Sequence, residues 1–381
     1  MWLMIEALDV FMFRDGKPFT SGEGHFANSL FPPSAFTIQG VLRSLYQSEM
    51  NISWDDWRDG AVDTVVFDAI GSHDNHHLGL FQMRGPYVAR WNEERSTIER
   101  FFPLPSDVIQ TEHGQLRVLH PSADILDASQ SDLDTDIHLL NLELEHREPS
   151  EKLWLPESEL VGEYLSFNEV SLNQCVVEAD LFVREGRFGT ALNYTHRTVR
   201  SDEGMLYAAN FIRPQSHVGL LIELPDPSPM ELLFNNVGAV HHMKIGGEGR
   251  AARFERIDSN MIVHSEVYNT SEGKPRKIVF LTPTYFANGW QPYSRSDWFK
   301  QHSVSAVVPR PLPLGGWDLV KRQPRSIHRF VQPGSVFYFD ERAAQSWNIP
   351  NLWTEQPPDT LPLERLGFGE HFIGFWEMGA K

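Results

Sequence analysis

The chain has 381 residues, of which 41% are hydrophobic and 12% aromatic, enough to bury a large core and form about two domains. The formal net charge of −18 argues against a free-standing nucleic-acid binder, because phosphate recognition normally leaves a basic surface. The one cysteine, Cys175, excludes a disulfide within the chain and a cysteine-based zinc finger.

The N-terminus indicates where the protein works. The first ten residues lack the basic start of a secretory signal and already contain Glu6 and Asp9. No uninterrupted apolar run approaches the ~18 residues that span a bilayer. We therefore expect a soluble, cytoplasmic protein that does not contact a membrane.

The charge is unevenly distributed. Residues 124–163 hold twelve acidic side chains against Arg147 and Lys152, so more than half of the excess negative charge lies in this segment. Residues 309–329 are instead basic, with five cationic side chains against Asp318 alone. A solvated face is the simplest interpretation of either run.

The first predicted elements are a strand and a helix. Residues 2–13 are rich in large apolar side chains and predict a strand that ends at the turn signal Asp15-Gly16. Ser34 follows two prolines and can cap a helix, whose apolar face is formed at i, i+3, i+4 and i+7 by Ile38, Val41, Leu42 and Leu45. The opposite stripe of this helix is polar: Gln39, Arg43 and Gln47.

The middle of the chain predicts more strands and an insertion. Residues 76–91 predict a strand pair around Gly85-Pro86. Residues from about 92 to 200 lack the regular alternation of a core element, apart from a strand pair at 181–197, and are interpreted as an inserted arm. Residues 204–224 alternate with period 2 and predict strands.

A second helix is predicted at 228–238. Ser228, Pro229 and Glu231 form a capping box with proline at the first helical position, and Gly238 can close the helix. Residues 245–250 (IGGEGR, the glycine loop) follow, and a strand comes next. The order to residue 258 is therefore βαββαβ, the ferredoxin-like order, interrupted by the arm.

The remaining residues repeat this theme. Residues 277–286, 333–340 and 366–376 predict strands, and a second glycine-rich stretch precedes the last of them. The predicted fold class is α+β with two ferredoxin-like domains. The first covers residues 1–258 with the insertion at about 92–200, and the second, degenerate domain covers 259–381.

Several stretches together resemble a known family. They are FRDGKPF, FPPSAFTIQGVLRS, RGPYV, PLPSD, GTALNYTHRTVRSDEGMLYAANFIRP, IGGEGRAARFE, FLTPTYFANGW, GGWD, PGSVFYF and LGFGEHFIG. Each is weak alone, but in this order they resemble the third-subunit family of the Cmr complex, the type III-B CRISPR effector. This family lies in the RAMP superfamily of ferredoxin-like, RRM-like RNA-binding proteins.

The resemblance implies a function. Members of this family hold the 5′ repeat-derived tag of the guide RNA (crRNA) and dock to the large polymerase-like Cmr subunit, while the inserted arm reaches the backbone Cmr subunit. The chemistry of antiviral defence belongs to the other subunits. The chain is therefore expected to be a CRISPR-associated, non-catalytic RNA-binding subunit without a cofactor.

The glycine loop is the most concrete candidate site. Gly246, Gly247 and Gly249 lack a Cβ, so the backbone can adopt positive φ and turn consecutive N–H groups toward a phosphate. Positive charge beside the loop comes from Lys244, Arg250 and Arg253. A tight turn without a ligand is the alternative interpretation, and Glu248 opposes phosphate binding.

Other candidate RNA contacts lie outside this loop. Arg14 and Lys17 lie at a predicted hairpin tip between Phe13 and Phe19, although both phenylalanines also suit an ordinary core. The remaining candidates are polar side chains on the first helix and basic side chains in two of the family-like regions: Gln39, Arg43, Arg197, Lys321, Arg322 and Arg325.

Two enzymatic alternatives remain open. A metal-independent RAMP endoribonuclease that processes guide RNA needs a general base, usually His, near the first helix, but residues 34–49 contain none. His25 precedes two prolines in a loop, and the adjacent His241 and His242 point in different directions. Residues 73–77 (HDNHH) suit exposed histidines better than a metal site. An unrelated small-molecule enzyme is the remaining alternative.

Overall fold

The computed structural model describes residues 1–14, 26–72, 77–126, 137–141, 146–147, 151–190, 192–193, 198–199, 206–265, 276–318, 323–344, 346–347 and 349–376. The chain forms two compact units, each assembled from separate stretches of sequence. Unit 1 comprises residues 1–90, 179–259 and 313–328, and unit 2 comprises 91–178, 260–312 and 329–381. Helices and strands occur in both, which confirms the mixed α and β class, whereas the domain boundary near residue 258 stays a prediction.

The main sheet of unit 1 has the strand order β3-β16-β1-β18-β17. Strand β1 is antiparallel to both of its neighbours, with Ile5 opposite Leu220 on one side and Phe254 on the other. These three side chains are fully buried, so β1 is the central strand of the unit's core. The strands are β1 (Trp2–Ala7), β3 (Arg84–Asn92), β16 (Val218–Glu223), β17 (Val240–Lys244) and β18 (Ala251–Ile257).

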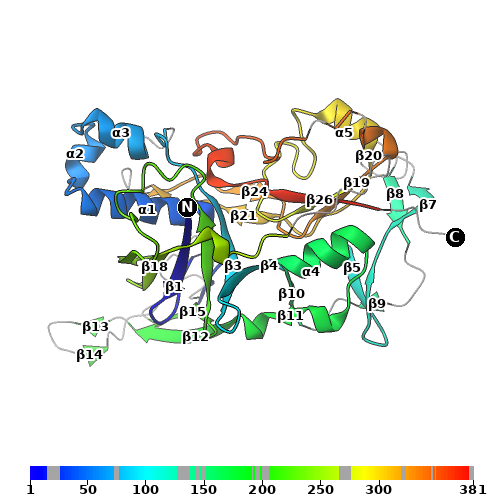
Figure 1. Ribbon diagram of the computed structural model, residues 1–381, viewed down its shortest axis with the longest axis horizontal. Coiled ribbons are helices and arrows are strands. Elements are labelled where there is room, and N and C mark those ends of the chain that lie inside the picture. The colour runs from blue at the N-terminus through cyan, green and yellow to red at the C-terminus, as the bar shows by residue number, and fades with distance from the viewer. Residues whose placement is uncertain are drawn as a thin grey trace. The chain divides into compact units, whose positions relative to one another are not determined.

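The helices of unit 1 follow one another directly (Figure 1): α1 (Ala35–Glu49), α2 (Trp54–Arg58) and α3 (Thr64–Ile70). The prediction of α1 is confirmed, including its start, because the Ser34 side chain accepts a hydrogen bond from the Phe36 N–H. This cap satisfies one of the N–H groups that a helix start leaves without an internal partner.

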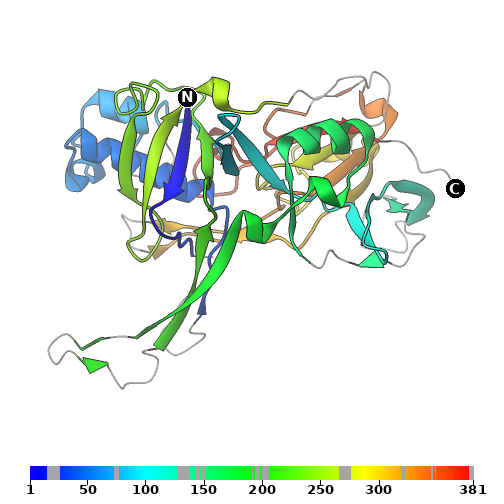
Figure 2. The ribbon, with the colours of Figure 1, turned by 60° about the horizontal axis from the view of Figure 1, so that its bottom comes forward.

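A second sheet in unit 1 is a long antiparallel ribbon (Figure 2). Strand β12 (Phe182–Thr190) pairs with β15 (Leu206–Pro214) over its whole length, and β2 (Phe26–Ala27) adds to β15 in parallel. The strands predicted in 204–224 are thus confirmed. The strand pair predicted at 181–197 is wrong, because β12 pairs with β15 and not with a second strand of that stretch. Four short strands complete the unit: β13 (Leu192–Asn193), β14 (Thr198–Val199), β22 (Trp317–Asp318) and β23 (Gln323–Pro324).

Two local predictions in unit 1 are wrong. The predicted strand pair at 76–91 is a single strand, β3, which continues through Gly85-Pro86 because it pairs with β16 on both sides of this dipeptide. The predicted helix at 228–238 is a series of turns. The carbonyls of Leu233 and Phe234 accept hydrogen bonds from the side chains of His241 (2.8 Å) and Arg256 (2.6 Å).

Unit 2 repeats the strand arrangement of unit 1. Its sheet has the order β20-β25-β19-β26, so its first strand in the chain, β19, lies between the third, β25, and the last, β26. In unit 1, β1 likewise lies between the third strand, β16, and the last, β18, and β17 adds at the edge beyond β18. The strands predicted in 277–286, 333–340 and 366–376 are confirmed. The elements are β19 (Arg276–Phe280), α5 (Ser296–His302), β20 (Ser303–Val307), β25 (Val336–Phe339), the 3₁₀ turns Glu341–Ala344 and Leu363–Leu366, and β26 (His371–Phe375).

The rest of unit 2 comes from the predicted arm and includes core residues. Leu160, Tyr164 and Leu165 are fully buried, so the expectation that 92–200 holds no core element is wrong for this part. Its described elements are β4 (Thr97–Pro103), β5 (Val108–Thr111), β6 (Leu116–Val118), β7 (Pro121–Leu126), β8 (Ile137–Leu140), β9 (His146–Arg147), β10 (Leu153–Pro156), α4 (Glu157–Glu159), the π-helical turn Leu160–Leu165, the 3₁₀ turn Leu172–Gln174 and β11 (Val176–Val177).

Four short elements lie at the borders of the units. They are the 3₁₀ turns Glu178–Asp180 and Ser259–Met261 and the paired strands β21 (Leu312–Leu314) and β24 (His328–Phe330). Within the described residues, no helix is both long and apolar enough to cross a membrane.

A buried polar network ties the arm residues of unit 2 to its sheet. The Asp107 carboxylate accepts hydrogen bonds from the hydroxyls of Tyr164 (2.8 Å) and Tyr338 (2.6 Å). The Lys277 ammonium lies 3.6 Å from the centroid of the Tyr164 ring and has no hydrogen-bond partner among the described residues. All four side chains are buried, so the network joins residues far apart in the chain inside one core.

This network predicts a rise of stability in mildly alkaline solution. Burial lowers the pKa of Lys277 to about 8, although the nearby Asp107 opposes the shift. An unfolded lysine titrates near ~10.4, so the unfolded state binds more protons between pH 8 and 10. The free energy of unfolding should therefore increase over this interval, by on the order of 2 kcal/mol. Urea unfolding at each pH measures it.

The control for this prediction is Lys277→Met, which should remove the rise. Above pH 10 the slope should reverse, because burial raises the pKa of both Tyr164 and Tyr338 above the value of an unfolded tyrosine. An equal rise in the wild type and in Lys277→Met would assign it to another group.

Candidate nucleic-acid interface

The chain that follows β1, residues 8–14 (the N-terminal segment), is held on both sides. The Leu8 N–H donates to the Ala251 carbonyl (3.1 Å), at the start of β18. Phe11 exchanges two backbone hydrogen bonds with Ile212 of β15 (2.8 and 2.9 Å). Val10 and Met12, on either side of Phe11, are buried in a small apolar cluster. Asp9 lies between the bonded Leu8 and the buried Val10, so its backbone position is fixed.

The glycine loop packs directly against this segment. It connects β17 to β18, and the Gly247 N–H donates to the Met12 carbonyl (2.8 Å). Gly246 has φ +70°, and a Cβ there would lie 2.2 Å from the Met12 oxygen. Only glycine allows this close approach.

The loop meets the prediction in part. Positive φ is found at Gly246 and Gly249, as expected, but not at Gly247, and Glu248 also has positive φ (55°). Three N–H groups of the loop, those of Ile245, Gly247 and Arg250, are bound within the protein rather than turned outward. Among the described residues, no partner binds the N–H groups of Gly246, Glu248 and Gly249, so these groups can still donate hydrogen bonds to an anion.

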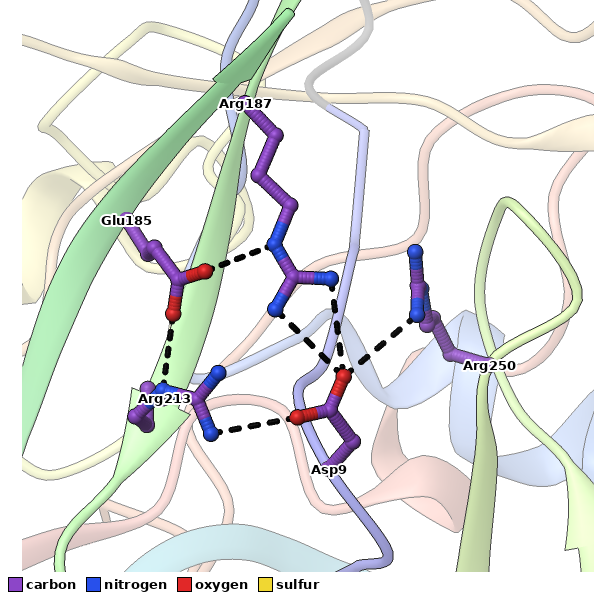
Figure 3. A network of polar contacts seen from close by, with 5 residues as sticks. All are labelled: Asp9, Glu185, Arg187, Arg213 and Arg250. Atoms are coloured by element: carbon purple, nitrogen blue, oxygen red, sulfur yellow. Dashed lines mark hydrogen bonds and ion pairs between the residues drawn. The ribbon is translucent and has the colours of Figure 1, made fainter. Parts of the chain in front are cut away.

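Arg250, the last residue of the loop, lies in a cluster of charged side chains (Figure 3). We call Asp9, Glu185, Arg187, Arg213 and Arg250 the arginine cluster. The Glu185 carboxylate accepts from Nε of Arg187 and from Nε of Arg213, both at 2.7 Å. The Asp9 carboxylate faces the terminal nitrogens of all three arginines, at 3.1 Å from Arg213, 3.4 Å from Arg187 and 3.5 Å from Arg250.

An aromatic ring supports two of these arginines. The guanidinium carbons of Arg187 and Arg250 lie 4.9 and 4.7 Å from the centroid of the Phe211 ring. Phe211 is itself buried in the apolar cluster, so cation–π attraction holds both guanidinium groups against a fixed surface.

Glu185, Arg187 and Arg213 stabilise one another's charges. Hydrogen bonds from Arg187 and Arg213 lower the pKa of Glu185, and its carboxylate in turn raises the pKa of both arginines. Three cationic and two anionic side chains leave one excess positive charge on this surface. All five remain partly exposed, so a ligand in solution can reach them.

The other predicted basic residues near the loop differ in their surroundings. Lys244 is exposed at the end of β17, beside the loop. Arg253 is engaged by Glu6 (2.8 Å) and Glu255 (2.5 Å), so its charge is already balanced. Arg14 is exposed and forms an isolated bridge with Ser29.

The polar stripe on α1, whose Gln39 and Arg43 are expected from the sequence to contact RNA, is buried. Gln39 and Arg43 are both less than a tenth exposed. Arg43 donates to Gln39 and to the carbonyl of Ser72, and its guanidinium lies over the ring of Trp57 (4.9 Å). These contacts give Arg43 a structural task between the helices of unit 1, and RNA contact by Gln39 or Arg43 is not supported by this geometry.

The remaining candidates are not joined to the cluster. Arg325 lies next to β23, where burial lowers its pKa, and no contact to the arginine cluster is found in the described part of the chain. Phe13 is buried, as its core interpretation expects. The other candidates of the prediction fall outside the described residues: Lys17, Phe19, Arg197, Lys321 and Arg322.

The cluster contains four residues that were not predicted from the sequence: Asp9, Glu185, Arg187 and Arg213. A signal was present, because residues two apart on a strand share a face and Glu185 and Arg187 are so spaced on β12. The β12–β15 register places Glu185 opposite Phe211 and Val183 opposite Arg213, which brings all these odd-numbered positions to one face.

The histidines considered as a general base or as metal ligands lie outside the arginine cluster. His241 is half-buried, with one ring nitrogen on the Leu233 carbonyl and the other 3.5 Å from Glu49. No group of three or more potential metal ligands occurs among the described residues, and residues 73–76 of the histidine-rich stretch lie outside them.

The comparison with known families decides the relationship. The family model of the CRISPR-associated protein (Cas_Cmr3) matches residues 3–376. The chain belongs to this family. The resemblance found in the sequence motifs is thus confirmed. No curated protein matches the chain.

Chains of three solved structures are similar to this chain to different degrees. A chain of the cryo-EM structure of the Type III-B Cmr-beta bound to cognate target RNA and AMPPnP, state 1, has a TM-score of 0.50 and 16% identity, covering 89% of this chain and 86% of that chain. A chain of the Type III-B Cmr-beta bound to cognate target RNA has a TM-score of 0.48 and 16% identity, covering 89% of this chain and 86% of that chain. A chain of the Csm3-Csm4 subcomplex in the type III-A CRISPR-Cas interference complex has a TM-score of 0.38 and 10% identity, covering 88% of this chain and 92% of that chain.

The close approach of Gly246 to the Met12 carbonyl predicts that alanine substitutions at Gly246 and Gly249 lower the stability of the protein by different amounts. Gly246→Ala must move the Met12 carbonyl and also strains a backbone of positive φ, so we expect a loss of about 2 to 4 kcal/mol in stability. Gly249→Ala has the same backbone strain (φ +62°) but opens into empty space, so it should cost only about 1 kcal/mol. Urea unfolding measures both. Equal losses would show that the contact with Met12 contributes little.

Proposed function

We propose that this chain is the non-catalytic RNA-binding subunit of a type III-B CRISPR effector complex in antiviral defence. In this role it holds the 5′ repeat-derived tag of the guide RNA and docks to the large polymerase-like subunit. Membership of the Cas_Cmr3 family carries the proposal. The fold shared with a chain of the Type III-B Cmr-beta complex, which binds target RNA, supports it.

The repeated strand order also supports an RNA-binding role. In both units the first strand lies between the third and the last, as in a ferredoxin-like, RRM-like domain, and unit 1 has one more strand, β17, at its edge. We interpret the units as two such domains, of which the second uses part of the predicted arm. The β12–β15 ribbon and the remainder of the arm are then available to a backbone subunit.

The glycine loop and the arginine cluster are the surface proposed to meet the guide. Single-stranded RNA is held by phosphate contacts and by stacking of bases, and three arginines with an exposed Lys244 provide the charge for such contacts. Arg250 belongs both to the predicted site and to the cluster, so it is the residue of choice for a test.

The proposal predicts a loss of guide retention in Arg250→Gln. We expect one phosphate contact to be lost, which lowers affinity by about 1 to 3 kcal/mol and reduces the salt slope of log K by ~0.7. The measurement is guide RNA recovered with the assembled complex over a salt series. Arg58→Gln is the matched control, because Arg58 is a partly exposed arginine paired with Asp55 and Asp59 on α2. Equal retention in wild type and both variants would contradict the proposed surface.

The alternative, a metal-independent endoribonuclease of the same superfamily, makes the opposite prediction in one assay. The purified chain incubated with repeat RNA in EDTA should leave the RNA intact, because the ring nitrogens of His241 are both engaged and His242 has no acid or base partner among the described contacts. Gel electrophoresis of end-labelled RNA measures it. Cleavage that His242→Ala abolishes would replace the non-catalytic proposal by the enzymatic one.

A further inference from the structure

The geometry of the arginine cluster suits the binding of an external anion in place of one of its two carboxylates. Glu185 and Asp9 are both carboxylates among the same arginines, but they bind differently. Glu185 meets Nε of Arg187 and Nε of Arg213 at 2.7 Å, within the optimum for a charged hydrogen bond. Asp9 meets only terminal nitrogens, at 3.1 to 3.5 Å, beyond that optimum.

The two carboxylates therefore have separable tasks. By holding both Nε atoms, Glu185 fixes the guanidinium groups of Arg187 and Arg213 and leaves their terminal N–H groups directed to one point (Figure 3). Arg250 adds a third guanidinium at this point, supported from below by Phe211. Asp9 lies where these donors converge, and its side chain is about half exposed (49%).

We propose that the convergence point of Arg187, Arg213 and Arg250 is a binding site for one RNA phosphate, and that Asp9 occupies it as an internal substitute until RNA displaces it. This rests on the proposed RNA-binding function and assigns Glu185 as a positioning residue. The phosphate oxygens take the terminal N–H groups, which fork toward an anion of this size.

Displacement of Asp9 is feasible for two reasons. Its contacts to the arginines are long, and its side chain is already about half exposed. The ion pairs that are lost when the carboxylate turns into solvent therefore contribute little energy. Its backbone stays in place because Leu8 and Phe11 are held by β18 and β15, so only the side chain has to rotate. A phosphate, with more acceptor oxygens, then competes for donors that Asp9 satisfies poorly.

The proposal predicts opposite effects of two substitutions that each remove one negative charge from the same cluster. Asp9→Asn weakens the internal competitor, so affinity for RNA should rise about 3- to 10-fold. Glu185→Gln releases the two guanidinium groups from their fixed orientation, so affinity should fall about 3- to 10-fold despite the more positive surface. Electrostatics alone would raise affinity in both.

The experiment uses the full-length chain and a 5′-labelled oligouridine of about twelve nucleotides, titrated by fluorescence anisotropy over a salt series. Arg213→Lys is a second positioning test, because it keeps the charge but lacks Nε and should also lower affinity. Arg187→Gln should reduce the salt slope of log K by ~0.7. Melting temperatures of all variants show whether each is folded.

The outcomes are distinct. A rise in both carboxylate variants would overturn the positioning task of Glu185, and a fall in Asp9→Asn would overturn the substitute role of Asp9. No binding of oligouridine by the folded wild type would overturn the phosphate site itself. The proposed function is judged separately, by whether guide RNA is recovered with the assembled complex, and its failure there would leave these binding curves unchanged.

Discussion

The candidate surface depends on the close contact between the glycine loop and the N-terminal segment. Because Gly246 and Gly247 bring their backbone onto the Met12 carbonyl, the β17–β18 hairpin cannot shift relative to residues 8–14. The same segment is bound on its other side to β15 through Phe11 and Ile212. One short stretch of chain thus joins the main sheet of unit 1 to the β12–β15 ribbon, and the arginine cluster forms at this junction.

This constraint explains why the cluster has its composition. Arg250 comes from the loop, Asp9 from the segment, and Glu185, Arg187 and Arg213 from the ribbon, so each of the three elements contributes charged side chains to one point. Phe211 is buried below them with Val10 and Met12. The apolar cluster holds the elements together and the charges lie on its exposed side, an arrangement in which packing rather than ion pairing supplies most of the stability.

The sequence predicted those features that depend on neighbours in the chain. The Ser34 cap, the apolar face of α1, strand β1 and the strands of the unit 2 sheet in 277–286, 333–340 and 366–376 follow from local patterns, and so does the glycine loop. The failures share one cause, which is a partner distant in sequence. A capping box at Ser228 predicts a helix, but Leu233 and Phe234 give their carbonyls to His241 and Arg256. A polar stripe on α1 predicts an exposed face, but Trp57 and Ser72 cover Arg43. The pairing of Glu185 with Arg213, which are 28 residues apart in the sequence, depends on the register of two strands, which no local pattern fixes.

The same distinction resolves the conflict between a net charge of −18 and a role in RNA binding. Net charge acts over distances beyond about 8 Å only weakly at physiological salt, because ions screen it, so a phosphate responds mainly to the charges it touches. At the arginine cluster, the charges that a phosphate touches are three guanidinium groups and two carboxylates. Glu185 binds Nε of Arg187 and Nε of Arg213, so it does not occupy the terminal N–H groups of these arginines. An acidic chain can therefore hold RNA at one surface, while its acidic excess discourages RNA elsewhere and limits binding to the place where donors are oriented.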